Sequence, residues 1–185
     1  MPTRRRLKRL MPGASRLTTC VVRTPYGWIE LSASPRGLTS TVLPRTANGP
    51  AKSPSQQRSE VNRQAARWLN QARRELQAYF LGKSKSFTCP VDLSGATPFQ
   101  RAVWRATAQV PYGRVRSYQW IAAKLGAPRS ARAVGNALGA NPVPLLIPCH
   151  RIVAGDASLG GFSCGLPWKR RLLKLEGSLR QLSKK

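Results

Sequence analysis

The chain has 185 residues, 41% of them hydrophobic, which is enough for the packed core of one ordinary domain or two small ones and excludes a globally disordered chain. Thirty-two Lys and Arg against six Asp and Glu give a net charge of +26, which is not typical of a soluble metabolic enzyme. We expect a polyanionic partner, first nucleic acid and second an acidic membrane surface, because clustered cations bind phosphates by releasing counterions. No run of about 18 apolar residues is present, which excludes a transmembrane helix.

Residues 1–16 are predicted to be a flexible basic arm. The run from Arg4 to Arg9 is not followed by the apolar segment of a secretory signal. An Arg-rich opening without acidic residues is also compatible with a transit peptide, but Pro2 and Pro12 disfavour the amphipathic helix that such a peptide forms.

Residues 17–92 are predicted to form an N-terminal α/β domain. Three short strands separated by turns, a pattern typical of an antiparallel meander, are expected at residues 20–24, 28–33 and 38–43. Residues 44–58 are rich in Pro, Ser, Asn and Gly and are predicted to be a loop. Apolar residues recur at helical spacing over residues 61–80, so we expect a helix that packs on the strands, followed by a last strand at residues 86–91.

Residues 97–177 are predicted to form a mostly helical C-terminal domain. Its first helix begins with a capping box made by Thr97 and Gln100, with Pro98 at the first helical position, and continues to Val110.

Two short helices follow, one after Ser117 and one after Pro128 or Ser130, joined by a glycine-containing turn. This arrangement fits a helix-turn-helix whose second helix carries Arg129 and Arg132. Short helix pairs more often only pack in a core, and it is the charge of +26 that favours nucleic acid binding here.

The remainder contains a glycine-rich loop at residues 155–165, a final helix at residues 167–176, and a frayed basic tail at residues 178–185. The predicted fold class is therefore α/β. A small N-terminal antiparallel sheet with a packed helix precedes a mostly helical C-terminal domain, which carries the helix-turn-helix and the candidate active-site cysteine.

The chemistry concentrates at Cys149 and His150, the only histidine of the chain. A thiol becomes a strong nucleophile as a thiolate, which a base and cationic neighbours favour; His150 and Arg151 are the local candidates. Adjacent side chains in extended backbone point apart, so proton transfer needs a turn or a bridging water. Glu176 is a candidate to orient the imidazole. From local context alone, Cys149 is more often a small buried hydrophobe than a nucleophile.

The four cysteines have no CxxC spacing, and with a single histidine a structural zinc site is not expected. We expect free thiols in a reducing compartment, which predicts a cytoplasmic protein, or a nuclear one in a eukaryote.

Residues 141–153, NPVPLLIPCHRIV, resemble the active-site signature of the O6-alkylguanine-DNA alkyltransferases, also called methylated-DNA–protein-cysteine methyltransferases. The resemblance covers about residues 97–177, whereas the first half resembles this family only in its strand-then-helix layout. Further matches in family order are Phe99-Gln100, Val103-Trp104, Pro111-Tyr112-Gly113, Ser117-Tyr118, residues 132–135, residues 160–165, Lys169, Leu172-Leu173 and Glu176.

The resemblance implies that Cys149 accepts the alkyl group, that His150 activates it through water, and that Glu176 orients His150. It also implies that Tyr118 helps to rotate the damaged nucleotide out of the duplex and donates a proton to the leaving guanine. A base inside the stack cannot be reached without such flipping.

The resemblance implies that Arg132 fills the gap left in the base stack. Together with Tyr118, Arg129 and Ser117 are further residues that we expect to contact DNA. Asn141 is expected to brace the turn before the active site. The flipped base is expected to contact Ser163, Phe162 and the backbone near Ile152.

The sequence departs from the family pattern at Phe162, where tyrosine is common, and at Cys164, where glycine is usual. Loss of the hydroxyl and a larger side chain leave open whether bulky alkyl groups are accepted. The metal site of some relatives has no match, and neither a metal nor a cofactor is expected.

We therefore predict a DNA repair enzyme that transfers the alkyl group of O6-alkylguanine irreversibly to Cys149, once per molecule; O4-alkylthymine is a further candidate substrate. The expected partner is double-stranded DNA, with no membrane, and the expected state is a monomer. Three alternatives are a lesion-recognition protein without chemistry, a basic cysteine hydrolase and a transcriptional regulator. The acceptor cysteine disfavours the first, and the second lacks a signal for an oxyanion hole. Strong sequence preference in DNA binding would favour the third.

Overall fold

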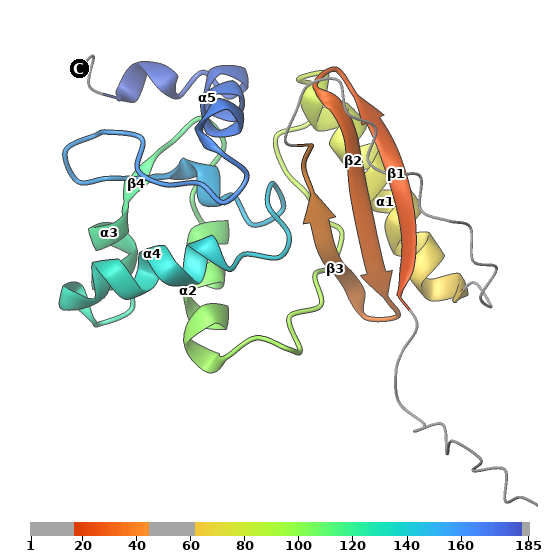
Figure 1. The fold of residues 1–185 in the computed structure, drawn as a ribbon, viewed down its shortest axis with the longest axis horizontal. Helices are drawn as coiled ribbons and strands as arrows, with labels where there is room; N and C mark the ends of the chain where they lie inside the picture. Colours follow the sequence, from red (N-terminus) through yellow and green to blue (C-terminus); the bar gives the residue numbers. More distant parts are fainter. Residues whose placement is uncertain (1–16, 45–61, 183–185) are drawn as a thin grey trace, which may run out of the picture.

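The computed structural model describes residues 17–44 and 62–182. The predicted basic arm at residues 1–16 lies outside the described residues, as do residues 45–58 of the predicted loop and residues 183–185 of the predicted tail. The described chain forms two domains that lie side by side, the sheet and its helix on the right of Figure 1 and a helical domain on the left.

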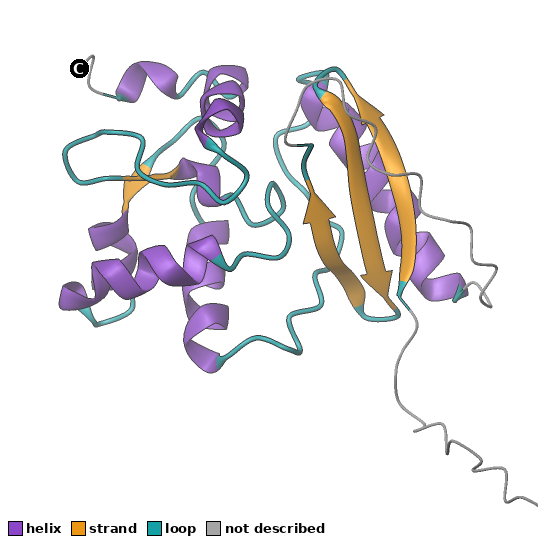
Figure 2. Ribbon diagram, in the orientation of Figure 1, coloured by secondary structure: helices purple, strands orange, loops and turns teal. Residues whose placement is uncertain are grey.

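The N-terminal domain is a three-stranded antiparallel sheet in the order β1-β2-β3, as the strand pattern predicts. Its strands are β1 (Thr18–Thr24), β2 (Gly27–Ser34) and β3 (Gly37–Val42). The helix α1 (Arg63–Phe80) crosses one face of the sheet (Figure 2). Its buried side chains recur every three or four residues, which aligns them in one stripe facing the strands.

The prediction of a strand at residues 86–91 is wrong, because this segment forms no strand. The backbone N–H groups of Thr88 and Cys89 both donate to a carboxylate oxygen of Glu75 on α1, at 3.1 Å each, so they are not available for a ladder. Pro90 has no N–H to offer. Only one isolated bridge joins the end of this segment to β3.

The C-terminal domain is helical, and the predicted capping box at Thr97 and Gln100 is present. Its α-helices are α2 (Pro98–Ala108), α3 (Tyr118–Lys124), α4 (Ala131–Gly139) and α5 (Leu166–Leu175). Its 3₁₀ turns are η1 (Pro128–Ser130), η2 (Cys149–Arg151) and η3 (Leu179–Gln181). The predicted helix-turn-helix corresponds to α3, η1 and α4. None of the described helices is long and apolar enough to cross a bilayer.

A two-stranded parallel pair, which the sequence pattern does not reveal, links the helix-turn-helix to the candidate active site. The strand β4 (Arg116–Ser117) pairs with β5 (Ile152–Val153). Because β4 ends where α3 begins and β5 follows η2 directly, this pairing fixes the start of α3 beside η2, the turn that contains Cys149.

The prediction of a frayed tail from residue 178 onwards is wrong for residues 178–182. Ser178 is buried, and its Oγ donates to the carbonyl of Leu173 at 3.3 Å. Nε2 of Gln181 donates to the carbonyl of Gly113 at 2.7 Å. These hydrogen bonds hold the segment after α5 against the domain.

The two domains share a continuous core. The N–H of Thr41 on β3 donates to the carbonyl of Pro142 at 2.9 Å, and the Trp168 indole on α5 donates to the carbonyl of Pro44 at 2.6 Å. The rings of Tyr26 and Trp168 meet edge to face at 5.8 Å. The N-terminal domain thus contacts both α5 and the loop that precedes η2.

Gly37 provides a test of how closely the segment around Pro90 approaches β3. Its φ is +151°, and an added Cβ would lie 2.5 Å from the Pro90 carbonyl oxygen. We expect Gly37→Ala to reduce the free energy of unfolding by about 2 to 4 kcal/mol, because strain and overpacking combine. The matched control is Gly82→Ala, where φ is +69° and no atom lies within 4 Å, with an expected cost of about 1 kcal/mol. Equal losses in urea unfolding would contradict the close approach.

Candidate active site

Cys149 begins η2, and its side chain borders a cavity of about 120 Å³. The residue is only 5% exposed, so the cavity is its route to solvent or a ligand. The cavity is enclosed by α3, α4 and the glycine-rich loop, and its other lining residues are Tyr118, Gly135, Leu138, Gly139, Gly161, Phe162 and Ser163. Three of the residues predicted for the site, Tyr118, Phe162 and Ser163, therefore surround the same space as the sulfur.

Asn141 connects the turn after α4 to the thiol. Its Nδ2 donates to Sγ of Cys149 at 3.0 Å and to the carbonyl of Ile147 at 2.9 Å, while its Oδ1 accepts from the N–H of Val143 at 3.0 Å. Within this turn Leu145 has a φ of 81°, a conformation that costs about 1 to 3 kcal/mol for a non-glycine residue. The three hydrogen bonds of Asn141 help to hold this strained turn and to place the sulfur.

The resting thiol is protonated. Burial raises the pKa of Cys149 to about 11, and the hydrogen bond from Asn141 and the charge of Lys169 only partly oppose this effect. A nucleophilic thiolate therefore requires a proton acceptor within the site.

His150 has the properties of that acceptor. It is fully buried, and its Nε2 lies 2.9 Å from Oε1 of Glu176. Since an ionised carboxylate only accepts hydrogen bonds, we assign the imidazole proton to Nε2. Nδ1 is buried and has no hydrogen-bond partner within the part of the chain that the structure describes. Burial lowers the pKa of His150, which leaves a neutral imidazole with a free lone pair at Nδ1.

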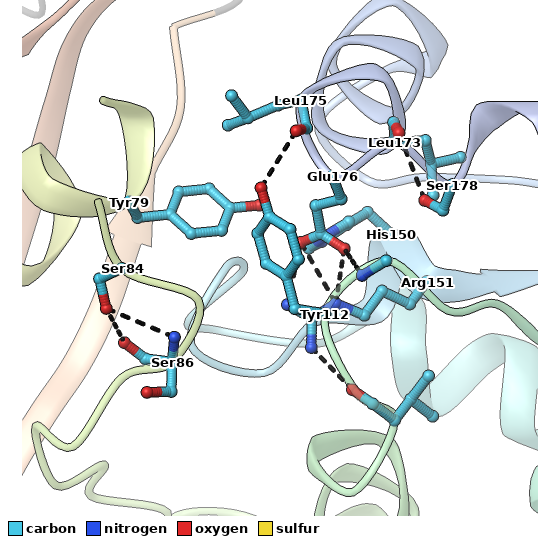
Figure 3. A network of polar contacts seen from close by, with 12 residues as sticks. Tyr79, Ser84, Ser86, Tyr112, His150, Arg151, Leu173, Leu175, Glu176 and Ser178 are labelled. Atoms are coloured by element: carbon cyan, nitrogen blue, oxygen red, sulfur yellow. Dashed lines mark hydrogen bonds and ion pairs between the residues drawn. The ribbon is translucent and has the colours of Figure 1, made fainter. Parts of the chain in front are cut away.

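Glu176 caps the end of α5 and is the centre of a buried polar network (Figure 3). Arg151 contacts both carboxylate oxygens, with Nε 2.9 Å from Oε2 and Nη2 2.9 Å from Oε1. The N–H of Gly113 donates to Oε2 at 3.2 Å, and Tyr79 Oη donates to Oε1 at 2.7 Å. Burial acts to raise the pKa of Glu176, but the hydrogen bonds and positive charge of its partners hold it at about 2.

Lys169, rather than Arg151, is the cation that acts on the thiol. The sequence suggests Arg151 as the cationic neighbour, but its guanidinium turns to Glu176 and to the carbonyl of Val110. Lys169 is fully buried, and its Nζ donates to the carbonyls of Ile152 at 2.6 Å and Gly161 at 3.0 Å. Burial lowers the pKa of Lys169 to about 8. Sequence reasoning does not single out Lys169 for this role. The one signal that could do so is that this lysine falls among the apolar residues on the buried face of α5.

Tyr118, the first residue of α3, lies against the glycine-rich loop. Its Oη donates to the carbonyl of Gly161 at 3.4 Å, and a Cβ on Gly160 would lie 3.0 Å from its ring. Burial, with a smaller effect of Cys149, raises the pKa of Tyr118, so its hydroxyl remains a proton donor. The neighbouring Ser117 caps α3, its Oγ accepting from the N–H of Trp120 at 3.1 Å.

The remaining predicted residues divide into exposed and buried positions. Arg129 on η1 and Arg132 on α4 are exposed. Ile152 is completely buried and does not line the cavity; its carbonyl is bonded to Lys169. Cys164 is not among the lining residues either, and its Sγ lies 3.9 Å from Oγ of Ser163.

All four cysteines are free thiols. Over residues 17–44 and 62–182, the structure brings no three His, Cys, Asp or Glu side chains into an arrangement that could hold a metal ion.

Comparisons with known proteins find matches over both domains. Residues 98–178 match the family model of the 6-O-methylguanine DNA methyltransferase DNA binding domain, and residues 18–93 match that of its ribonuclease-like domain. The methylated-DNA–protein-cysteine methyltransferase of Methanosarcina barkeri is 46% identical over 110 residues, which are 60% of this chain and 69% of that protein. The chain belongs to the O6-methylguanine DNA methyltransferase family.

Solved structures of family members are similar over most of the chain. A crystal structure of Mycobacterium tuberculosis OGT in complex with DNA aligns with a TM-score of 0.70 and 34% identity, covering 87% of this chain and 93% of that one. A crystal structure of the O6-methylguanine methyltransferase of the same organism gives 0.69 and 32%, covering 92% and 97%. The N-terminal half, in which sequence motifs alone indicate only a similar layout, matches the family model and is part of the shared fold.

The low pKa of Glu176 predicts a loss of stability in acid. An ordinary glutamate has a pKa of 4.5 and Glu176 has about 2, so the stabilisation is complete above pH 4.5 and is lost as the pH falls towards 2. From pH 7 to pH 3 the loss from this group is about 2 kcal/mol. We expect Glu176→Gln to be less stable at pH 7 but to lack this increment, as measured by urea unfolding at both pH values.

The control is Glu30→Gln, which changes a carboxylate on β2 outside the network. It should lose stability between pH 7 and pH 3 as the unmodified protein does. An unchanged acid loss in Glu176→Gln would show that this carboxylate is not held in its ionised form.

Proposed function

We propose that the protein repairs O6-alkylguanine in DNA by transferring the alkyl group to Sγ of Cys149, with the flipped base held in the cavity beside it. The protein is a methylated-DNA–protein-cysteine methyltransferase, a DNA-binding repair enzyme, as its relatives and its family indicate. The observation that carries the residue assignment is the single cavity that brings together Cys149, Tyr118 and the loop of Phe162 and Ser163.

Formation of the nucleophile begins with proton transfer. The proton of the Cys149 thiol passes through a bridging water to Nδ1 of His150. The Nε2–H group of His150 meanwhile keeps its hydrogen bond to Glu176. The Glu176 carboxylate stabilises the resulting imidazolium. The thiolate is stabilised by the amide of Asn141 and by the nearby charge of Lys169.

Transfer then exchanges one bond for another. The Sγ–C bond forms as the C–O6 bond breaks, and its electron pair moves onto the guanine, which takes the hydroxyl proton of Tyr118. Tyr118 regains a proton from solvent and His150 releases one, so protons balance. The thioether at Cys149 has no good leaving group, and each molecule therefore acts once.

DNA recognition is assigned to the helix-turn-helix. Arg132 at the start of α4 and Arg129 on η1 are exposed. In the proposed complex, Arg132 enters the base stack and fills the gap left by the flipped nucleotide. The partner is double-stranded DNA containing O6-alkylguanine, and O4-alkylthymine is a second substrate to test. The protein acts as a monomer, in the cytoplasm or, in a eukaryote, the nucleus, without a membrane partner.

A lesion-recognition protein that flips the base without chemistry is the main alternative. It would not require a thiol at the cavity, nor a buried imidazole with a free acceptor nitrogen nearby. The presence of both at residues 149 and 150 favours transfer.

Replacing the acceptor sulfur separates chemistry from binding. We expect Cys149→Ala to abolish transfer from a methylated oligonucleotide while DNA affinity changes by less than about threefold, because the phosphate contacts are unaffected. Mass spectrometry should find one methyl group on the Cys149 peptide of the unmodified protein. The control is Cys89→Ala, which removes a buried cysteine of the N-terminal domain. This variant should still become methylated at Cys149. The absence of a methyl adduct on Cys149 would overturn the proposal.

Arg132 tests base flipping. Arg132→Ala should slow repair of a methylated duplex by about tenfold or more and slow repair of a methylated single strand less, because only in the duplex does the flipped base leave a gap in a paired base stack for the arginine to fill. Arg105→Ala, an exposed arginine on α2, serves as a control for simple loss of charge. Equal slowing of single strand and duplex by Arg132→Ala would refute the role in the stack.

A further inference from the structure

The N-terminal domain reaches into the proton relay through one side chain. Tyr79 lies in the last turn of α1, is completely buried, and donates from Oη to Oε1 of Glu176 at 2.7 Å (Figure 3). The two residues are 97 positions apart. The tyrosine ring is fixed by Phe80, Phe87 and Tyr112, with ring centroids 5.2 to 5.9 Å away.

Tyr79 and His150 share one carboxylate oxygen. Oε1 of Glu176 accepts from Tyr79 Oη at 2.7 Å and lies 2.9 Å from Nε2 of His150. A donor on this oxygen withdraws negative charge from it, so the carboxylate stabilises an imidazolium less. The orientation of the carboxylate does not require Tyr79, because Arg151 grips both oxygens and Gly113 donates to Oε2. The effect of the hydroxyl is therefore mainly electrostatic.

We propose that Tyr79 is a positioning residue for alkyl transfer, which keeps His150 a neutral proton acceptor by sharing Oε1 of Glu176. This inference rests on the proposed role of His150 in accepting the Cys149 proton. A histidine that is already protonated cannot take the thiol proton, so the network must stabilise an imidazolium during transfer without forming one beforehand.

The other charged groups around His150 lie on its own turn, η2, and on α5. Arg151 on η2 and Lys169 on α5 are cations that disfavour an imidazolium at His150, and Glu176 is the anion that favours it. The Tyr112 hydroxyl donates to the carbonyl of Leu175 at 3.0 Å rather than to the carboxylate. Burial and the charge of Glu176 raise the pKa of Tyr79 far above the usual range, so it remains a donor at every pH at which the protein works.

The chain offers a direct measurement because His150 is its only histidine. All imidazole ¹⁵N signals of the untagged protein therefore belong to His150, and they report both its tautomer and its protonation. In the unmodified protein we expect a neutral ring protonated at Nε2. In Tyr79→Phe, which removes only the hydroxyl, we expect His150 to become protonated about one pH unit higher.

Tyr112→Phe is the matched control, since it removes a neighbouring hydroxyl that does not bond to Glu176. Its His150 titration should coincide with that of the unmodified protein. If Tyr79→Phe, folded as judged by thermal unfolding, titrates like the control or at a lower pH, the inference is wrong.

A second substitution tests the same claim from the opposite side and retains the aromatic packing. Placing 3-fluorotyrosine at position 79 makes the phenol a stronger donor, and His150 should then become protonated at a lower pH than in the unmodified protein. A shift to higher pH, or none, would overturn the inference even if Tyr79→Phe does not fold.

The rate of transfer gives the functional readout. The acidic limb of the single-turnover rate against pH should move to higher pH in Tyr79→Phe, by the same amount as the His150 titration, and should stay in place in Tyr112→Phe. An unmodified protein that never methylates Cys149 would refute the proposed function, whereas the ¹⁵N titrations would still decide the effect of Tyr79 on His150. Titration shifts without a matching shift of the rate profile would refute the role of Tyr79 in transfer.

Discussion

The buried carboxylate of Glu176 is the interaction on which the rest of the site depends. A carboxylate that is 5% exposed is tolerated only when its charge is paired and its oxygens accept hydrogen bonds. Its partners come from α1, from the loop before β4, and from η2, segments that are far apart in the chain. Satisfying this one charge therefore aligns His150, holds Arg151 in place and joins the two domains. The relay geometry and the interdomain contact are consequences of the same requirement.

Burial of the sulfur sets a second constraint, which opposes reactivity. A thiol with a pKa of about 11 is almost entirely protonated near neutral pH and is a poor nucleophile towards alkylating agents in solution. Asn141 and Lys169 place a donor and a positive charge where the thiolate forms, and His150 offers a free acceptor nitrogen. Such a thiol reacts slowly until a proton acceptor has taken its proton. Because each molecule is proposed to react once, keeping Cys149 unreactive towards other electrophiles matters as much as activating it for the substrate.

Local signals in the sequence predict the elements, and long-range contacts account for what they miss. The helix α1 follows from its apolar spacing and α2 from its capping box. The pairing of β4 with β5 has only two residues on each side and leaves no periodic pattern. The segment at residues 86–91 has strand-like composition, but the carboxylate of Glu75 takes its N–H groups. Tyr79 and Lys169 lie on apolar helix faces, where a polar tip that reaches a distant partner looks like ordinary core.

The N-terminal domain consequently does more than cover one side of the C-terminal domain. Its β3 strand bonds to Pro142, the residue after the asparagine that holds the thiol, and α1 bonds to the carboxylate that holds the imidazole. Both contacts fall on costly features, the strained turn at Leu145 and the buried charge of Glu176. A domain that packs against such features stabilises them only while it is docked. The small sheet and its helix thus contribute to the active site from outside the domain that contains it, because β3 supports the turn that holds the thiol and the Tyr79 hydroxyl on α1 shares the carboxylate that contacts the imidazole.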